Sequence, residues 1–368
     1  MVFASLLASF YIECDALHKF IKVLFHCHNL FSVPFSNKRI NPIIPSIFII
    51  QENILFTSNK LYAHTWNGQV YVSGASLGIK INTEVEVLGT FGIEYEGKVY
   101  TPWMDKIFEH DILSKVNGNE IKSASSLIKF IEESKGKEVD VLVKRDNKFI
   151  NTKIKPILNK DKYSLGLYVK DYDMGVGTLT FIEPSTMTYA SLGHKMVDKP
   201  ILGGSVYKTN VDSIIKPREN QAGEKRATII GNSIGSVFMN NELGIYGQMY
   251  DNTYLSSSTL LDVGSKSDAH KGNAYILTTT AGQNISKYNI EITKLQTQKK
   301  SDIKGIKFKV TDDELLDISG GIVQGMSGSP IIQDNKLIGA VTHVILSDPS
   351  EGYGCYAEFM LNNLGFTK

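Results

Sequence analysis

The residues best able to do chemistry lie in one glycine-rich stretch near the C-terminus, Gly320-Gly321-Ile322-Val323-Gln324-Gly325-Met326-Ser327-Gly328-Ser329-Pro330. A serine hydroxyl is a poor nucleophile unless a base lies beside it and backbone N–H groups face the developing oxyanion. Gly325 and Gly328 allow the tight turn that brings such amides close to a substrate. The pattern predicts Ser327 as a nucleophile, and its alternative is an ordinary Gly/Ser turn between two strands.

The sequence after this stretch predicts the structure that displays it. Residues 330–333 and 337–341 read as two strands, and Asp334-Asn335-Lys336 between them reads as a turn. A serine loop that leads into a β-hairpin is typical of chymotrypsin-like peptidases. The expected reaction is therefore hydrolysis of an acyl bond through a serine ester.

Such a serine needs a base, and His194, His270 and His343 lie in the same part of the chain. His194 follows a turn of small residues just after the strand predicted over 178–182, which suits an imidazole at the rim of a barrel. His343 lies on the strand after the hairpin and is the second candidate, while His270 lies in a charged loop. We expect His194 to be the general base.

The third member of a triad must orient the imidazole and stabilise its charged form. The candidates just before the serine are Asp312, Asp313 and Asp317, and Asp198 is a weaker one. Asp312 follows the alternating strand predicted over 306–310, and it could equally cap a short helical turn.

The positioning elements divide into three regions. Residues 157–368 carry short alternating strands with glycine between them and little helical periodicity, which predicts a β-barrel or sandwich pair. Residues 70–156 predict a small α+β domain: a strand over 84–88, a strand–Asn-Gly–strand unit over 110–121, a helix capped by Ser123 or Ser125, and two last strands. Residues 1–60 carry two apolar stretches, each shorter than a membrane span requires.

The first sixty residues allow three readings: a membrane anchor, an export leader, or a start codon chosen upstream of the true one. We favour an anchor or a leader, although no lysine or arginine precedes the first apolar stretch. His26-Cys27-His28 lacks a second ligand cluster, so no metal site is expected there. The net charge of +1 gives no reason to expect nucleic acid, and three scattered cysteines do not form a disulfide framework.

The order of elements over 70–156 resembles a bacterial PDZ domain, in which an apolar-Gly-apolar loop binds a peptide C-terminus. The resemblance implies that Leu77, Gly78 and Ile79 form the carboxylate loop and that Ile128 lines the peptide groove. It departs from the family pattern at His110, where a glycine usually precedes the Asp.

The C-terminal region is similar to the stage-IV sporulation protein B family, the PDZ-containing serine peptidases of endospore-forming bacteria. The similarity rests on 320–333, Ile338-Gly339-Ala340-Val341-Thr342-His343-Val344, 190–194 and 217–225, and it covers about 70–368. It implies a PDZ-like domain followed by a chymotrypsin-like double β-barrel. It also implies Ser327 as nucleophile, His194 as base, Asp312 as orienting carboxylate, and the N–H groups of Gly325 and Ser327 as oxyanion hole, with no cofactor.

The same resemblance implies a place in sporulation signalling. By that resemblance, the enzyme would be exported from the forespore into the intermembrane space, membrane-associated or secreted, and would there cleave itself and a regulatory membrane-protein partner. That cleavage would release an intramembrane metalloprotease, which processes a late mother-cell sigma factor. Two other classes stay open from the residues alone: an inert PDZ-type peptide-binding scaffold, and a hydrolase of small esters, which the strand–loop–strand context disfavours.

Overall fold

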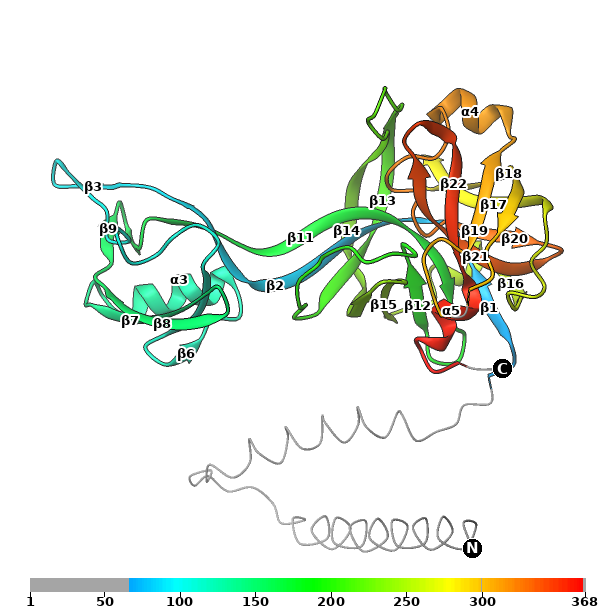
Figure 1. Ribbon diagram of the computed structural model, residues 1–368. Coiled ribbons are helices and arrows are strands. Elements are labelled where there is room, and N and C mark those ends of the chain that lie inside the picture. Colours follow the sequence, from blue (N-terminus) through cyan, green and yellow to red (C-terminus); the bar gives the residue numbers. More distant parts are fainter. Residues whose placement is uncertain (1–65, 299, 367–368) are drawn as a thin grey trace, which may run out of the picture. The chain divides into compact units, whose positions relative to one another are not determined.

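The computed structural model describes residues 66–298 and 300–366, so the expectations for residues 1–60 lie outside the described residues. Within the described part, no helix is both long and apolar enough to cross a membrane. The fold is mostly β, as expected. Its strands form one extended sheet system, antiparallel except where β16 pairs with β21, with two short hairpins beside it (Figure 1).

The small α+β domain is inserted between two long strands, β2 (Ser76–Thr90) and β11 (Leu167–Ile182), which pair with each other. Its core contains Val85, Leu113, Leu127 and Ile154. Its other elements are β3 (Ile93–Tyr95), β4 (Lys98–Tyr100), β5 (Ile112–Val116), β6 (Asn119–Glu120), α3 (Ala124–Glu133), β7 (Val139–Arg145), β8 (Lys148–Ile154), β9 (Ile157–Asn159) and β10 (Lys162–Ser164).

Local sequence explains these elements. Asn117 and Gly118 have φ of 48° and 79°, the left-handed values that an Asn-Gly hairpin turn requires, and they join β5 to β6 as predicted. The Ser123 hydroxyl accepts from Ser126 N at 3.1 Å and caps α3. His110 has φ of 68°, which explains why glycine is usual there.

The first part of β2 belongs to the barrel, not to the small domain. Leu77, Ile79 and Ile81 are fully buried in a core that they share with Leu179 and Val206. The small domain therefore begins near residue 83, later than the residue 70 expected from the sequence. Its last contributions, Leu165 to Val169, extend beyond the expected end at 156.

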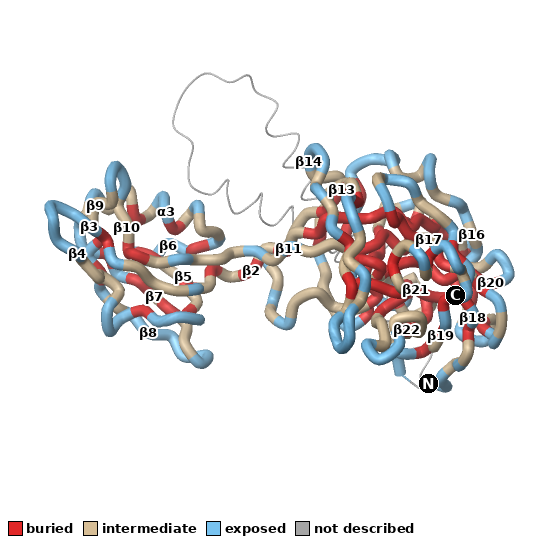
Figure 2. The backbone as a smooth tube through the Cα atoms, turned by 90° about the horizontal axis from the view of Figure 1, so that it is seen from above, coloured by how far each residue is buried: buried red, intermediate tan, exposed pale blue. Residues whose placement is uncertain are grey.

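The remaining strands form two β halves, whose cores hold most of the buried residues (Figure 2). The first half includes β12 (Thr188–Ser191), β13 (Gly204–Ile215), β14 (Glu224–Asn241) and β15 (Gly244–Met249). The second contains β16 (Thr259–Val263), β17 (Gly272–Ala281), β18 (Asn284–Leu295), β19 (Ile306–Val310), α4 (Asp313–Ser319), β20 (Pro330–Gln333), β21 (Lys336–Ile345), β22 (Asp348–Tyr356) and α5 (Ala357–Asn362). Strand β1 (Gln69–Val72) pairs with β11 and β16, and a 3₁₀ turn covers Leu255–Ser257.

Candidate active site

The serine loop runs from the end of α4 to the start of β20. Gly320, with φ of 69°, ends the helix, and the predicted hairpin β20–β21 follows. Gly328 has φ of +90°, and a Cβ there would lie 2.2 Å from Thr178 O and 2.4 Å from Leu192 N. Only a glycine lets the loop pack this closely on β11 and on the turn that leads to His194.

The backbone of the loop leaves two amides open. Gly328 N donates to Val341 O at 2.7 Å, and Met326 N donates to Val323 O at 3.1 Å. Among the described residues, no acceptor is found for the N–H groups of Gly325 and Ser327, the two amides expected to form the oxyanion hole. Two open amides separated by a single residue, Met326, can bind one oxyanion together.

The half-buried Ser327 side chain lies against β21. Its Oγ donates to the carbonyl of Thr342 at 3.2 Å, and its own carbonyl accepts from Thr178 N at 2.9 Å. The hydroxyl is therefore directed toward the start of the Thr342–His343 segment, which also meets the turn that carries His194.

His194 follows β12 in a turn where Leu192 and Gly193 both have φ of 67°. Its Nδ1 lies 2.8 Å from Lys195 O, and its ring centroid lies 5.2 Å from that of His343. Desolvation by burial lowers the pKa of His194 below its usual 6.5, so the imidazole is neutral at neutral pH. With Nδ1–H donating to the carbonyl, Nε2 carries the lone pair that a general base needs.

Ser327 and His194 therefore meet at the same short piece of β21. Ser327 bonds the backbone of Thr342, while His194 contacts the ring of His343 and Gly193 packs on the Thr342 side chain. No hydrogen bond joins the two directly in the described structure, which is common before substrate binds. Of the other candidates, His343 is adjacent, and exposed His270 instead pairs with Asp334 at 2.7 Å.

The structure does not bring Asp312 to His194. One carboxylate oxygen accepts from Asn289 N at 3.0 Å, and the other accepts from Leu315 N at 3.2 Å as the N-cap of α4. Asp312 therefore caps the helix, which was the second interpretation of this residue. An Asp just before a helix accepts from a backbone N–H of the first turn that has no partner within the helix. Asp313 lies in the first turn of α4 and Asp317 within the same helix. Asp198 is exposed and pairs with Lys195 at 2.9 Å.

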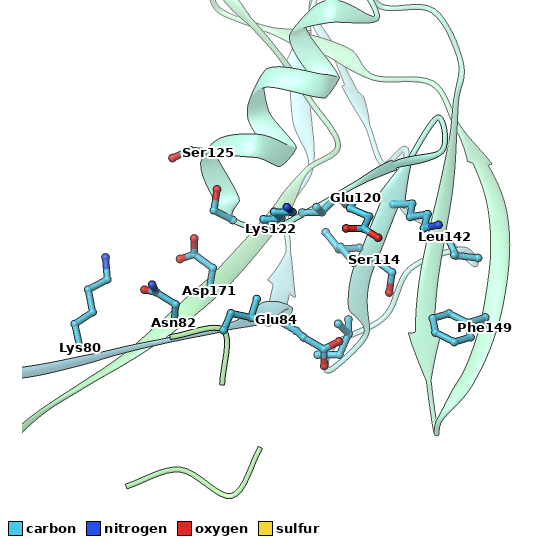
Figure 3. Close-up of a pocket in the computed structure, with 16 residues that line it drawn as sticks. Lys80, Asn82, Glu84, Ser114, Glu120, Lys122, Ser125, Leu142, Phe149 and Asp171 are labelled. Atoms are coloured by element: carbon cyan, nitrogen blue, oxygen red, sulfur yellow. The ribbon is translucent and has the colours of Figure 1, made fainter. Parts of the chain in front are cut away.

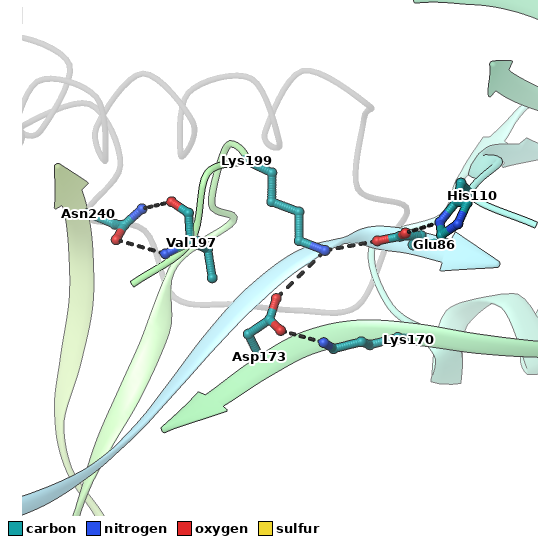
Figure 4. A network of polar contacts seen from close by, with 7 residues as sticks. All are labelled: Glu86, His110, Lys170, Asp173, Val197, Lys199 and Asn240. Carbon is teal, nitrogen blue, oxygen red and sulfur yellow. Dashed lines mark hydrogen bonds and ion pairs between the residues drawn. The ribbon is translucent and has the colours of Figure 1, made fainter. Parts of the chain in front are cut away.

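The turn that carries His194 is fixed by two residues that sequence reasoning missed (Figure 4). Asn240 of β14 accepts from Met196 N at 2.8 Å. It also donates to Val197 O at 2.8 Å, as Figure 4 shows. Lys199 bonds Glu86 at 3.0 Å and approaches Asp173 at 3.6 Å, and Glu86 also bonds His110 at 3.0 Å. An Asn on an alternating strand gives no sequence signal for such a role.

The expected carboxylate loop at 77–79 is wrong. Leu77, Gly78 and Ile79 lie within β2, whose two edges pair with β11 and β13 at these positions. Their amides therefore belong to a sheet and cannot bind a peptide terminus. Ile128 does have an exposed position on α3, with a side chain 53% exposed.

A second run of the same kind lies in the small domain, where the sequence analysis did not consider it. Leu165-Gly166-Leu167 leads into β11, which starts at Leu167. The strand continues past the N-terminus of α3, where Asp171 accepts from Ala124 N at 2.8 Å. The sequence signal for this second run is an apolar-Gly-apolar tripeptide whose last residue starts a strand.

A pocket of about 910 Å³ lies on the small domain, lined by β5, the start of α3 and parts of β2 and β11 (Figure 3). Ser114, Glu120, Lys122 and Asp171 give it a polar wall, and Leu142 and Phe149 an apolar one. It includes none of the predicted catalytic residues. The described residues contain no group of three or more potential metal ligands.

Comparisons with known proteins gave one family match and several similar structures. Residues 161–361 match the family described as SpoIVB peptidase S55. No match was found among curated proteins.

Solved structures match parts of the chain. One is the PDZ domain of the SdrC-like protein Lmo2051 from Listeria monocytogenes, at 22% identity, covering 23% of this chain and 86% of that one, with a TM-score of 0.19. Another is the active form of the Rv3671c protease from M. tuberculosis, at 13% identity, covering 53% and 74%, with a TM-score of 0.30. An inactive form of Rv3671c matches at 15% identity, covering 52% and 80%, with a TM-score of 0.29.

Proposed function

This chain belongs to the SpoIVB peptidase S55 family, and we propose that it is a serine endopeptidase with Ser327 as nucleophile and His194 as general base. The observation that carries the proposal is the convergence of both side chains on Thr342–His343, beside two open loop amides. The expected double β-barrel and small α+β domain supply the scaffold.

The proposed mechanism uses these groups in sequence. Nε2 of His194 removes the proton from Ser327 Oγ, which attacks a peptide carbonyl, and the N–H groups of Gly325 and Ser327 stabilise the oxyanion. His194 then gives the proton to the leaving amine, leaving an acyl-enzyme. Water, deprotonated by His194, hydrolyses that ester and regenerates the serine.

The orienting group in this mechanism is a carbonyl. Lys195 O accepts from Nδ1 of His194 and holds the ring in one tautomer, the task that a carboxylate performs in a Ser-His-Asp triad. A carbonyl dipole stabilises the imidazolium less than a full negative charge does. The expectation of Asp312 in that role is replaced by this contact.

A fluorophosphonate probe tests the activated nucleophile. We expect covalent labelling of the parental protein and none of Ser327→Ala. Ser329→Ala is the matched control, because Ser329 lies in the same loop, is fully buried and has no hydrogen-bond partner for its hydroxyl among the described residues. Absence of labelling in the parental protein would favour the inert peptide-binding scaffold.

The biological role is proposed from family membership. The enzyme acts in sporulation signalling in the forespore intermembrane space, where it cleaves itself and a membrane-bound regulator of an intramembrane metalloprotease. That cut triggers late mother-cell sigma-factor processing. Intact-mass analysis of the protein from sporulating cells, beside Ser327→Ala, tests self-cleavage: a shortened form of the parental protein alone supports it, and equal masses contradict it.

A further inference from the structure

A lysine lies buried beneath the serine loop, where the proposed mechanism gives it no task. Lys225, on β14, is only 4% exposed, and a Cβ placed on Gly325 would lie 3.1 Å from its Cβ and 3.3 Å from its Cδ. Its Nζ bonds two threonine hydroxyls, Thr278 at 2.9 Å and Thr178 at 3.4 Å. No carboxylate pairs with it in the described structure.

Burying an amine without an acid is costly, because the charged form loses its water. Desolvation accordingly lowers the pKa of Lys225 to about 7. An apolar side chain of similar length would fill the same space at lower cost. The amine is joined to the serine loop through a single hydroxyl, that of Thr178, which indicates that the buried amine helps to hold the loop.

The contacts of Lys225 and Thr178 reach three carbonyls of the serine loop, those of Gln324, Gly325 and Ser327. Lys225 N donates to Gln324 O at 2.9 Å, Thr178 Oγ1 donates to Gly325 O at 2.8 Å, and Thr178 N donates to Ser327 O at 2.9 Å. All of these bonds hold the loop from its buried side.

Those bonds determine where the Gly325 amide points. In a trans peptide the C=O and the next N–H point in opposite directions. Because Gln324 O faces Lys225, the N–H of Gly325 faces the open side, where an oxyanion would bind. Because Gly325 O faces Thr178, the following peptide is held against rotation as well.

We propose that Lys225 is a positioning residue of the oxyanion hole: by donating to Thr178 it fixes the hydroxyl that holds Gly325 O, and so holds in place the 325–326 peptide that lies between the two oxyanion-hole amides. Lys225 acts through Thr178 and touches no substrate. The proposal rests on the function proposed above, since it assigns a task within that active site.

The test measures the rate of fluorophosphonate labelling, separated into the limiting rate kinact and the half-saturating concentration KI. Removing an oxyanion-hole donor outright costs about 10²–10³ in rate, so loosening one should cost about tenfold. We expect Lys225→Met to lower kinact about tenfold with KI little changed, and with no loss of melting temperature.

Thr178→Val and Thr278→Val test whether Lys225 acts on the serine loop through the Thr178 hydroxyl or only through general packing. Thr178→Val removes the hydroxyl bonded to Gly325 O and should lower kinact as much as Lys225→Met does. Thr278→Val is the matched control, because its hydroxyl bonds Nζ but not the serine loop; its kinact should stay close to parental. The double variant Lys225→Met/Thr178→Val should label no more slowly than Thr178→Val alone, because the losses in kinact do not add when one residue acts through the other.

Two results overturn the proposal while leaving the peptidase in place: Lys225→Met labels as fast as the parental protein, or the double variant shows the product of the two single losses. A parental protein that fails to label overturns the proposed function itself. The two failures are therefore distinguishable in one series of measurements.

Discussion

The ring of His194 lies 5.2 Å from the ring of His343, and the backbone carbonyl of Thr342, the residue before His343, accepts a hydrogen bond from the Ser327 hydroxyl. Two imidazoles thus lie beside one nucleophile, but only one is held in a defined tautomer. Nδ1 of His194 bonds Lys195 O, whereas Nδ1 of His343 is buried and has no partner among the described residues. This difference is the structural reason for assigning the base to His194.

The first prediction separates the two histidines by substitution. His194→Phe should lose the contribution of general base catalysis, about 10²–10⁴ in labelling rate. His343→Phe should keep most of that rate, because a ring of similar size preserves the packing against His194. Fluorophosphonate labelling measures both, and the reverse pattern would transfer the base to His343.

The second prediction concerns pH. A base works only when it is unprotonated, so labelling falls as pH drops through the pKa of His194. Burial lowers that pKa below 6.5, and the acid limb of the rate profile should therefore have its midpoint below pH 6.5. A profile of labelling rate from pH 4.5 to 8.5 measures it; a midpoint above 6.5 contradicts the assignment.

The third prediction concerns Asp312. A triad aspartate replaced by asparagine costs about 10⁴ in rate. As a helix cap, however, Asp312→Asn should keep labelling within about tenfold, because Asn caps a helix about as well as Asp does. Asp312→Ala should cost about 1 kcal/mol in the free energy of unfolding. A loss of several orders of magnitude in Asp312→Asn would restore the triad that the sequence suggested.

The fourth prediction concerns the close approach at Gly328. A Cβ there would lie 2.2 Å from Thr178 O, so the loop or β11 must move. We expect Gly328→Ala to cost about 2 kcal/mol in the free energy of unfolding and to lower labelling sharply.

Gly231→Ala is the control for backbone strain alone. Gly231 also has a positive φ, +69°, but its Cβ position has no neighbour within 4 Å. Its cost should be about 1 kcal/mol, with labelling preserved. Equal effects of the two substitutions on labelling would show that the contact with β11 is unimportant.

The fifth prediction concerns the stability contribution of Lys225. Its pKa falls from 10.5 unfolded to about 7 folded, so between these values the unfolded chain binds more protons and stability rises with pH. For this single group the rise between pH 7 and pH 10 is on the order of 3 kcal/mol. Lys225→Met should remove that rise, so its stability advantage over the parental protein should shrink as pH increases.

Urea unfolding of both proteins at pH 7 and pH 10 measures this difference. If the free energy of unfolding rises between pH 7 and pH 10 by the same amount in the parental protein and in Lys225→Met, the amine is solvated in the folded state.

Sequence patterns predicted those parts of the molecule that local physics determines. The alternation over 306–310 matches β19, the Asn117-Gly118 turn joins β5 to β6, and Ser123 caps α3. The serine loop and its hairpin were predicted because glycine, proline and alternation agree over many residues.

The errors arose where one pattern serves two structures. Leu77-Gly78-Ile79 fits a carboxylate loop and equally a buried strand, and only the partners β11 and β13 decide between them. Asp312 fits a triad and a helix cap, which differ in tertiary contacts alone. Lys225 lies in the segment 217–225 that carries the family resemblance, but its role could not be predicted, because a lysine between Glu224 and Arg226 predicts a solvated surface.

Strand β11 has a consequence for how a signal could travel along this chain. Its first residues pack in the small domain's core, and Thr178, eleven positions after Leu167, holds the carbonyls of Gly325 and Ser327. β11 pairs with β2 from Leu167 to Thr178, with two register shifts near residues 168–172, so one continuous strand joins the two cores. A displacement of the first residues of β11 is therefore expected to reach the backbone and hydroxyl donors of Thr178 that hold the serine loop.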